Sequence, residues 1–222
     1  SDDSTDYSLD FASCKELRGY YKHIKTLSDD LSSEIGSFAD TDCHTYSTGG
    51  QDIDYCSKVL NILVSAGSVI GTANITFDMG VIDTRTGPFV YLNPDFYPEE
   101  QKYAVCPFDY FESPLKEFLI SKLGYMGMVR DDGWPPCGVV MQDLENTLRG
   151  NWFQQGDYPE HIEDYHLSMA EHNYDEKQLI VMGRESGISA SDSSISDFSV
   201  EFTATDSGQV NRDISDVTDN SV

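Results

Sequence analysis

The sequence predicts a mainly β protein with few short helices. Apolar and polar residues alternate along several stretches, as in 75–79, and other such stretches come in pairs around turn formers, as in 165–183. Helical patterns are confined to short stretches at 28–35 and 113–124. Alternation is typical of a strand with one buried face, because successive side chains point to opposite sides of a sheet. Paired strands at this spacing favour antiparallel sheets, and in the second half a β-sandwich or barrel.

Composition sets the class of protein. The 222 residues are 39% hydrophobic and include 13 Tyr and 11 Phe, which is enough for a buried core. With 39 acidic residues against 14 basic ones the net charge is −25, and a surface this negative repels phosphate backbones. We therefore expect no nucleic-acid partner and a highly soluble extracellular or salt-adapted protein. No run of eighteen apolar residues is present, so we expect no membrane span.

The five cysteines are spread along the chain without a C-x-x-C pair, which disfavours a zinc knuckle or a thioredoxin-like site. In an acidic chain poor in lysine, spread cysteines indicate disulfides formed in an oxidising compartment, so we expect a secreted or cell-surface protein. Cys106 and Cys137 bracket a loop and a helix and make one expected pair. Cys14, Cys43 and Cys56 are three candidates for a second bond, and the odd count indicates a missing partner.

The first third of the chain contains several expected strands and one helix. Tyr7, Leu9 and Phe11 alternate with polar residues, as in a half-buried strand. Ser28 precedes an apolar-periodic stretch and is a typical residue to begin a helix. In chain order we expect a strand at 6–11, a turn at Gly19, a strand at 20–24, a helix at 28–35 and a strand at 60–64.

The stretch 65–83 organises this first part. A small-residue turn at 66–67 leads into a strand in which Ile75, Phe77 and Met79 alternate with polar residues. The alternation places three polar side chains in a row on one face of the strand. These are Asn74, Thr76 and Asp78.

Two motifs resemble the lysostaphin-type zinc endopeptidases, a family that cuts peptidoglycan. The glycine turn and strand at 66–79 are similar to the family's "aGqxIG" and "HLHFE" elements, and Tyr21-Lys22-His23-Ile24 is similar to its "Y-x-H-L" element. With the order of the expected strands, the resemblance covers residues 6–83. It implies a degenerate endopeptidase-like antiparallel β domain in a secreted bacterial protein, joined to a β-rich domain.

The resemblance also implies a role for the polar face of this strand. In the family the "HxH" strand carries a catalytic His and a zinc-ligand His, and here Asn74 and Thr76 stand at those positions. A zinc hydrolase needs about three protein ligands and a base, which His23 alone does not supply. We therefore expect no enzyme, no catalytic residue and no metal in the groove. The face with His23, Asn74, Thr76 and Asp78 is still expected to bind a glycan or peptide through hydrogen bonds.

The second half begins with turn formers and a helix. Ser113 as the cap and Pro114 at the first helical position predict a helix whose apolar stripe covers a sheet and which ends at Gly124. Beyond it we expect one hairpin from 138–143 and 148–154, a second from 165–172 and 178–183, and a strand at 198–205. The expected partition is an endopeptidase-like domain at 1–103, a linker with a covering helix at 104–136, and a truncated β-rich domain at 137–222.

Two further clusters carry metal-ligand chemistry. His161, His166 and His172 lie among carboxylates, but the last two, six residues apart on one expected strand, would be about 20 Å apart. We interpret them as solvated polar positions, and a metal pair of His161 with His166 across a loop is the alternative. Near the C-terminus, three aspartates recur every third residue without the Gly-hinged spacing of a calcium loop, so no cofactor is expected and Ca2+ is the one alternative. They are Asp213, Asp216 and Asp219.

The first functional hypothesis is a non-catalytic secreted or cell-surface protein with a binding or structural-assembly role on a hydrolase-derived scaffold. The alternative is an active zinc metallohydrolase of peptidoglycan or peptide with non-standard ligands, such as His23 with His44 or the cluster at 161–172. A third hypothesis is self-assembly, in which a neighbouring copy pairs with open sheet edges. The sequence has no G-x-S-x-G elbow, phosphate-binding glycine loop, H-E-x-x-H or dinucleotide fingerprint.

Overall fold

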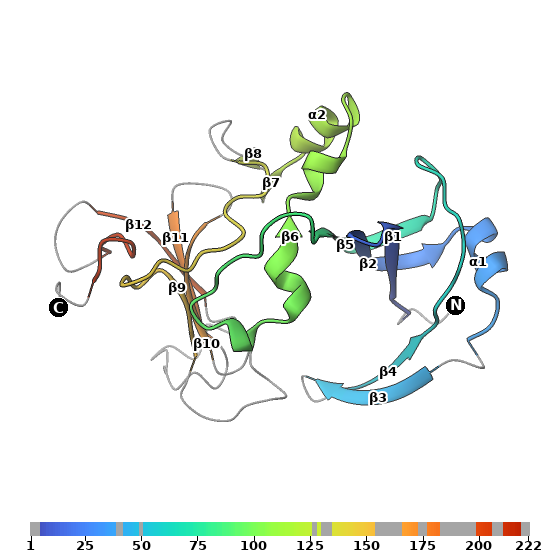
Figure 1. Ribbon diagram of the computed structural model, residues 1–222, viewed down its shortest axis with the longest axis horizontal. Coiled ribbons are helices and arrows are strands. Elements are labelled where there is room, and N and C mark those ends of the chain that lie inside the picture. The colour runs from blue at the N-terminus through green and yellow to red at the C-terminus, as the bar shows by residue number, and fades with distance from the viewer. Residues whose placement is uncertain are drawn as a thin grey trace. The chain divides into compact units, whose positions relative to one another are not determined.

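The computed structural model describes residues 5–38, 42–48, 51–125, 128–129, 135–153, 166–172, 177–182, 199–205 and 211–218. Within them the protein is mainly β, with few short helices and several antiparallel sheets, which confirms the expected class (Figure 1). The elements in chain order are β1 (Tyr7–Cys14), β2 (Leu17–Leu27), α1 (Asp29–Ile35), β3 (Asp42–Thr48), β4 (Gln51–Ser57), β5 (Gly71–Asp83), the 3-10 helices η1 (Pro94–Phe96) and η2 (Glu99–Tyr103), β6 (Ala104–Val105), the 3-10 helix η3 (Pro107–Tyr110), α2 (Leu115–Ile120), β7 (Gly124–Tyr125), β8 (Met128–Val129), β9 (Gly150–Phe153), β10 (His166–Glu171), β11 (Lys177–Met182) and β12 (Ser199–Thr203). None of the described helices is both long and apolar enough to cross a membrane.

The chain forms two compact units. Unit 1 comprises residues 1–11 and 19–79, and unit 2 comprises residues 12–18 and 80–222. The division falls inside β1, β2 and β5, because these long strands each contribute residues to both units. The partition expected from the sequence, with boundaries after residues 103 and 136, stays a prediction.

One sheet contains β1, β2, β5 and β6 in that order, so β2 lies between β1 and β5. The turn from β1 to β2 lies at Lys15 and Glu16; the expected turn at Gly19 is wrong, and β2 runs through the glycine. The Phe11 ring lies over Gly19, and a Cβ atom at this position would collide with the ring. The glycine therefore leaves room for the ring of the neighbouring strand. Close approach of a neighbouring group is a known reason for glycine inside a strand.

Among the described residues of unit 1, helix α1 provides most of the buried apolar side chains. It begins as expected after Ser28, whose Oγ accepts a hydrogen bond from the Leu31 amide at 3.3 Å. Leu31 and Ile35 are buried, as is Ile24 of β2. At the other end the Lys58 ammonium donates to the Ile35 carbonyl oxygen at 2.6 Å. A cation is favourable there because the last carbonyls of a helix lack partners within it.

A two-stranded hairpin of β3 and β4 follows α1, and the alternation pattern did not predict it. Cys43 and Cys56 lie directly opposite each other and form a disulfide with Cα atoms 4.1 Å apart. This bond settles the choice among the three candidates and leaves Cys14 as a free, exposed thiol. An isolated two-stranded hairpin is only marginally stable, so the disulfide is the main covalent restraint on this one.

The expected strand at 60–64 is wrong. In the described structure this stretch, between β4 and β5, belongs to no sheet, and Leu63 within it is 96% exposed. The neighbours of β5 are β2 and β6, so the apolar stretch does not pair with it. The turn expected at 66–67 is confirmed, with φ 83° at Gly67.

Unit 2 contains an antiparallel sheet of β12, β11, β10 and β9 in that order (Figure 1). The expected hairpin at 165–183 is confirmed as β10 and β11, which pair from Leu167 opposite Met182 to Glu171 opposite Gln178. The expected last strand is confirmed as β12, which pairs with β11. These segments have the alternation and length typical of strands, and in the structure they are paired strands.

The other expected hairpin in unit 2 is wrong in its first half. A strand forms within 148–154 as β9, but it pairs with β10, and 138–143 forms no strand. The Asp143 carboxylate accepts hydrogen bonds from the backbone amides of Leu92 and Asn151 at 2.9 and 3.1 Å. A side chain thus satisfies backbone donors that a neighbouring strand would otherwise satisfy.

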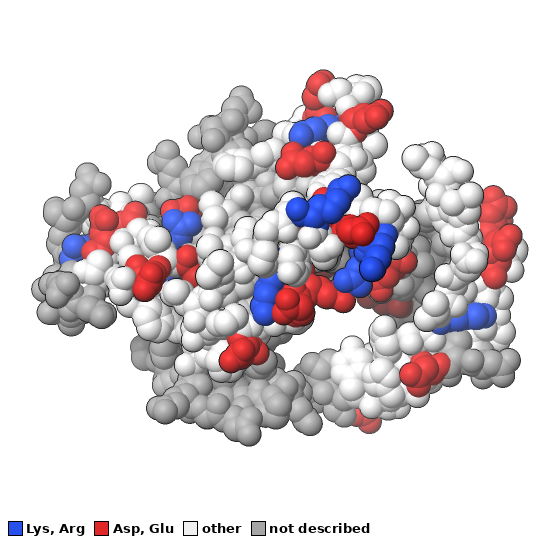
Figure 2. Space-filling view, viewed as in Figure 1, with Lys and Arg blue, Asp and Glu red and all other residues white. Residues whose placement is uncertain are grey.

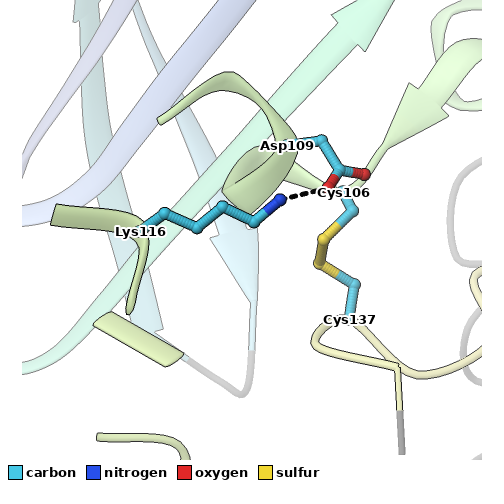
Figure 3. Close-up of a disulfide and its surroundings, with 4 residues drawn as sticks. All are labelled: Cys106, Asp109, Lys116 and Cys137. Atoms are coloured by element: carbon cyan, nitrogen blue, oxygen red, sulfur yellow. Dashed lines mark hydrogen bonds and ion pairs between the residues drawn. A yellow bond between two sulfur atoms is a disulfide. The ribbon is translucent and has the colours of Figure 1, made fainter. Parts of the chain in front are cut away.

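The expected disulfide between Cys106 and Cys137 is confirmed, with Cα atoms 5.5 Å apart (Figure 3). Helix α2 lies between these cysteines in the sequence and contacts η3. An ion pair joins the two helices, from the Lys116 ammonium to Asp109 Oδ1 at 2.9 Å (Figure 3). The disulfide and the ion pair together restrain this segment of unit 2.

Helix α2 begins differently from the expectation. The Ser113 hydroxyl does not cap it but donates to Glu117 Oε1 at 2.8 Å, and Pro114 is the last residue before the helix. Leu115 and Phe118 of the expected apolar stripe are 48% and 57% exposed. That the helix covers a sheet stays a prediction.

Gly19→Ala should lower the free energy of unfolding by about 1–3 kcal/mol, because the added methyl group forces the Phe11 ring out of its place. Urea unfolding of Gly19→Ala, of Phe11→Ala and of the double variant measures this coupling. In the Phe11→Ala background the methyl group should cost less than about 0.5 kcal/mol. Equal costs in the two backgrounds would contradict the packing role of the glycine.

Removing the hairpin disulfide with Cys43→Ser and Cys56→Ser should lower the local stability of β3 and β4 by about 3 kcal/mol, the effect of closing a short loop. Hydrogen exchange of the β3 and β4 amides measures the change. Cys14→Ser is the matched control, because that thiol is free and exposed. Hairpin amides that stay equally protected without the bond would show that other contacts hold the hairpin.

Candidate functional site

The residues expected to line a groove lie on the neighbouring strands β2 and β5. His23 is in β2, and Thr76 and Asp78 are exposed on β5. The backbone of Asn74 lies in β5, but its side chain falls outside the described residues. Thr76 and Asp78 are two residues apart on one strand and therefore share a face. The structure brings His23 to this face at Asp78.

His23 lies between two carboxylates. Its Nδ1 is 2.8 Å from Oδ2 of Asp6, the residue before β1, and its Nε2 is 3.6 Å from Oδ2 of Asp78 on β5. The three side chains form a row across the sheet, which we call the polar row. They are 40%, 53% and 59% exposed for His23, Asp6 and Asp78. Ion pairs this exposed contribute little to stability. The same exposure leaves the three side chains accessible to a ligand.

A second row of side chains crosses the same three strands. Phe11, Tyr21 and Phe77 stack in sequence, with ring centroids 4.9 and 5.6 Å apart and interplanar angles of 28° and 23°. We call this the aromatic row. Cross-strand aromatic pairs stabilise a sheet and fix the strand register. Tyr21 has a ring on both faces, whereas Phe11 and Phe77 each contact one ring of the row and are 40% and 48% exposed.

The two rows lie on opposite faces of the sheet, and the backbone at His23 explains how. Tyr21 and His23 are two residues apart and would share a face of a regular strand. Tyr21 nevertheless meets Phe77, whereas His23 meets Asp78, the next residue along β5. His23 has φ 61°, in the left-handed region that side chains seldom adopt. This irregularity turns its side chain to the other face, and such positions cluster at functional sites.

The polar row is not a set of ligands for one metal ion. The two ring nitrogens of a histidine point away from each other, so Asp6 and Asp78 lie on opposite sides of the His23 ring. Within the part of the chain that the structure describes, no group of three or more His, Cys, Asp or Glu side chains is placed to hold a metal ion. That the protein holds no metal stays a prediction.

The other histidines lie in separate surroundings. His44 packs beside the Tyr55 ring in the β3–β4 hairpin, with centroids 5.2 Å apart. His172 follows β10, and its Nε2 lies 3.3 Å from Glu201 Oε1 on β12. His161 falls outside the described residues. None of the described histidines belongs to a metal-binding group.

The aspartates considered for calcium are only partly described. Asp213 Oδ1 accepts a hydrogen bond from the Ser215 amide at 2.8 Å, as in a turn stabilised by its own side chain. Asp216 lies in the same turn, with its amide 3.0 Å from the Asp213 carbonyl oxygen, and Asp219 falls outside the described residues. The geometry of Asp213 is accounted for by the turn.

A second cluster, which the sequence patterns did not reveal, surrounds the Asp83 carboxylate in unit 2. Asp83 ends β5 and is 4% exposed. The Arg85 guanidinium donates to both oxygens, from Nε to Oδ1 at 2.8 Å and from Nη2 to Oδ2 at 2.6 Å. The Tyr110 hydroxyl also donates to Oδ2, at 2.6 Å. The turn Asp83-Thr84-Arg85 after a strand was a sequence signal for the contact between Asp83 and Arg85. No local pattern indicates the contact with Tyr110, which is 27 residues from Asp83 in the sequence.

These donors explain the protonation behaviour of the cluster. The hydrogen bond from Arg85, followed by that from Tyr110, holds the pKa of the Asp83 carboxyl well below its usual range. The same carboxylate raises the pKa of Arg85, and burial first, then the bond to Asp83, raises the pKa of Tyr110. A carboxylate held ionised by this many donors is a poor base. We therefore interpret the cluster as a structural hydrogen-bond network that joins the end of β5 to η3.

A third polar group lies among aromatic rings in unit 2. The Asn151 side-chain amide donates to the Tyr97 hydroxyl at 2.5 Å, and its carbonyl oxygen is hydrogen-bonded to the Ser168 hydroxyl. Tyr97 stacks on Tyr91 with centroids 3.8 Å apart. Burial raises the pKa of Tyr97 to about 12. The group therefore joins β9 and β10 to the segment before η2 as neutral, hydrogen-bonded packing.

No family model, no curated protein and no solved structure matches this chain. The resemblance to the lysostaphin-type endopeptidases therefore stays a prediction from the motifs in 6–83.

Asp83→Asn should destabilise the protein most at neutral pH, and the loss should shrink in acid. The pKa of Asp83 is lowered from its ordinary value of 3.8 in the folded protein, so the carboxylate stabilises the fold above that value and loses this effect as the pH falls below it. Urea unfolding at about pH 7 and about pH 3 measures the difference. Glu100→Gln is the control, because its ion pair with Arg18 is exposed. A loss that is the same at both pH values would contradict the assignment.

Proposed function

We propose that this is a non-catalytic, secreted or cell-surface protein that binds an extended ligand at the polar row. The observation that carries the proposal is the geometry at His23, whose ring nitrogens face Asp6 and Asp78 in opposite directions. Exposed donors and acceptors are in place to bind a ligand, and Thr76 extends the same face. A metal ion with an activated water would need its ligands to converge on one point.

Charge favours a ligand that carries amino groups. The polar row sets two carboxylates beside one histidine, on a chain with a net charge of −25. Figure 2 shows acidic side chains distributed over the visible face. A negative potential attracts cations and repels anions. An amine-bearing glycan or peptide should therefore bind better than an acidic glycan.

The location outside the cell is supported by the two disulfides, Cys43–Cys56 and Cys106–Cys137. Disulfides persist in oxidising compartments and are rare in the reducing cytosol. A hydrolase-derived scaffold that has lost its metal ligands would retain the strand edges and hydroxyls that contact substrate. This evolutionary part of the proposal is supported by the motif resemblance alone.

The alternative function, an active zinc metallohydrolase, would require different contacts for His23. His23 would have to release Asp6 or Asp78 to coordinate a metal, and further ligands would have to come from elsewhere in the chain. It would bind metal tightly and lose activity in a His23→Ala variant. Zinc content of the purified protein, measured together with peptidoglycan release, separates the two functions: stoichiometric zinc with turnover would overturn the binding proposal.

His23→Asn should weaken ligand binding by about 1 kcal/mol, because it removes the imidazole hydrogen bonds while asparagine tolerates the left-handed backbone. Asn74→Ala should weaken it by about the same amount. NMR titration with peptidoglycan fragments that carry free amino groups measures both, and neither protein should hydrolyse them.

His44→Asn, on β3, is the matched control and should leave the affinity unchanged. A strand 74–78 whose resonances stay unperturbed by every amine-bearing and acidic fragment would overturn the binding function of the polar row.

A further inference from the structure

Among the described residues of unit 1, the two most exposed large apolar side chains lie in one stretch between β4 and β5, residues 59–64, which we call the open segment. Val59 is 100% exposed and Leu63 is 96% exposed. The segment reads Val-Leu-Asn-Ile-Leu-Val and carries no charge, and the surface that it forms in Figure 2 is white. Within the described part of the chain, no backbone hydrogen bond involves these residues.

The open segment has the properties of a strand without a partner strand. Its exposure alternates: Val59 and Leu63 are fully open, whereas Leu60 is 38% exposed, Ile62 is half-buried and Val64 is 47% exposed. More and less exposed side chains thus alternate with a period of two, as they do along a strand. Val, Ile and Leu also favour strands where they can pack. Free N–H and C=O groups along such a segment form a template for pairing with another chain.

We propose that the open segment pairs with the open segment of a second copy of this chain, as an antiparallel strand pair around a two-fold axis. Self-pairing of this kind makes a closed, isologous contact. It is a form of strand addition, in which main-chain hydrogen bonds supply affinity and the opposed side chains supply specificity. The open segment shares no residue with the polar row, and the inference does not depend on the proposed ligand.

Symmetry limits the pairing to a few registers. A two-fold axis between antiparallel strands is perpendicular to their sheet, so opposed residues must be an even number of positions apart in the sequence. The register centred on Asn61 meets this condition. It places Val59 opposite Leu63 of the second copy and Leu60 opposite Ile62, so that apolar residues meet apolar residues.

The same register places the Asn61 amide opposite its own copy. Two amides can then donate to and accept from each other, which satisfies the one polar side chain of the segment. The neighbouring symmetric register, centred on Ile62, places Asn61 opposite Leu63 and leaves the amide unpaired between apolar groups. A buried polar group without a partner is costly, so the Asn61-centred register is favoured.

Charge and size determine how strong the contact is. The segment offers no charged group that an oppositely charged protein would recognise, whereas its apolar sequence complements itself. Each copy carries a net charge of −25, so two copies repel each other at a distance. One strand pair is also smaller than the roughly 1,200–2,000 Å² of a stable interface. We therefore expect a weak, concentration-dependent dimer that salt strengthens.

Sedimentation equilibrium of the chain tests the association. Raising NaCl from about 0.1 M to about 1 M shortens the screening length from about 10 Å to about 3 Å and should tighten the dimer, because repulsion is screened and apolar contacts are not. Leu63→Lys should weaken dimerisation at least about tenfold, since it puts a charge opposite Val59. Val90→Lys in unit 2 is the matched control: its side chain is 80% exposed and it adds the same charge.

Cross-linking tests the register. In a Cys14→Ser background, Asn61→Cys should form a disulfide-linked dimer in a glutathione redox buffer, because residue 61 faces its own copy. Leu63→Cys should not, because the two residues 63 would be offset by four positions, about 13 Å along the strand, beyond the reach of a disulfide. Both substituted positions are exposed, so the variants should fold.

Several results would overturn the proposal. A chain that stays monomeric at high concentration in about 1 M salt has no such contact. A dimer that Leu63→Lys and Val90→Lys weaken equally forms through another surface. Cross-linking through position 63 but not 61 contradicts the register, and assemblies that grow without limit contradict a closed pair.

Discussion

The stacking of Phe11, Tyr21 and Phe77 across β1, β2 and β5 is the interaction on which the candidate site depends. Because side chains alternate along a strand, a slip of one residue would turn every side chain of that strand to the other face. The aromatic row prevents this slip, and Gly19 makes room for it by leaving the space under the Phe11 ring empty. With the register fixed, Asp6 and Asp78 are on either side of β2, and the left-handed backbone of His23 brings its ring between them.

Scarcity of cations shapes the rest of the molecule. The chain has 14 basic residues, and several of them serve packing at fixed places rather than the open surface. Arg85 holds the buried Asp83 carboxylate, Arg149 pairs with Glu171 at 2.7 Å, and Lys58 binds the C-terminal end of α1. Most carboxylates have no cation available to them by number alone, so the surface keeps its negative potential. An acidic pair beside His23 is thus one local part of a general property, made specific by the geometry of the ring.

The sequence predicted the elements whose signal is local. The Ser28 cap and the helix after it, the β10–β11 hairpin and β12 follow from patterns within a short window, and the Cys106–Cys137 bond was expected from the loop and helix that the two cysteines bracket. What it missed depends on contacts between different elements. The Phe11 ring on β1 packs over Gly19, the Asp143 carboxylate accepts hydrogen bonds from the amides of Leu92 and Asn151, and Tyr110 and Arg85 donate to the buried Asp83 carboxylate. At the candidate site, the face of Thr76 and Asp78 was predicted, whereas the role of Asp6 and the turned backbone of His23 were not.

The expected strand at 60–64 differs from the other errors, because nothing in the described structure replaces it. The Asp143 carboxylate accepts hydrogen bonds from the amides of Leu92 and Asn151, whereas within the described residues no backbone hydrogen bond involves the open segment. This periodicity predicts a neighbouring strand, and within the described residues of one copy no strand pairs with the segment. Natural sequences are locally consistent with their folds, so a conflict that persists is expected at a functional or strained site. A second copy supplies the neighbouring strand with the fewest assumptions, since the segment has an asparagine near its centre and apolar residues on both sides of it.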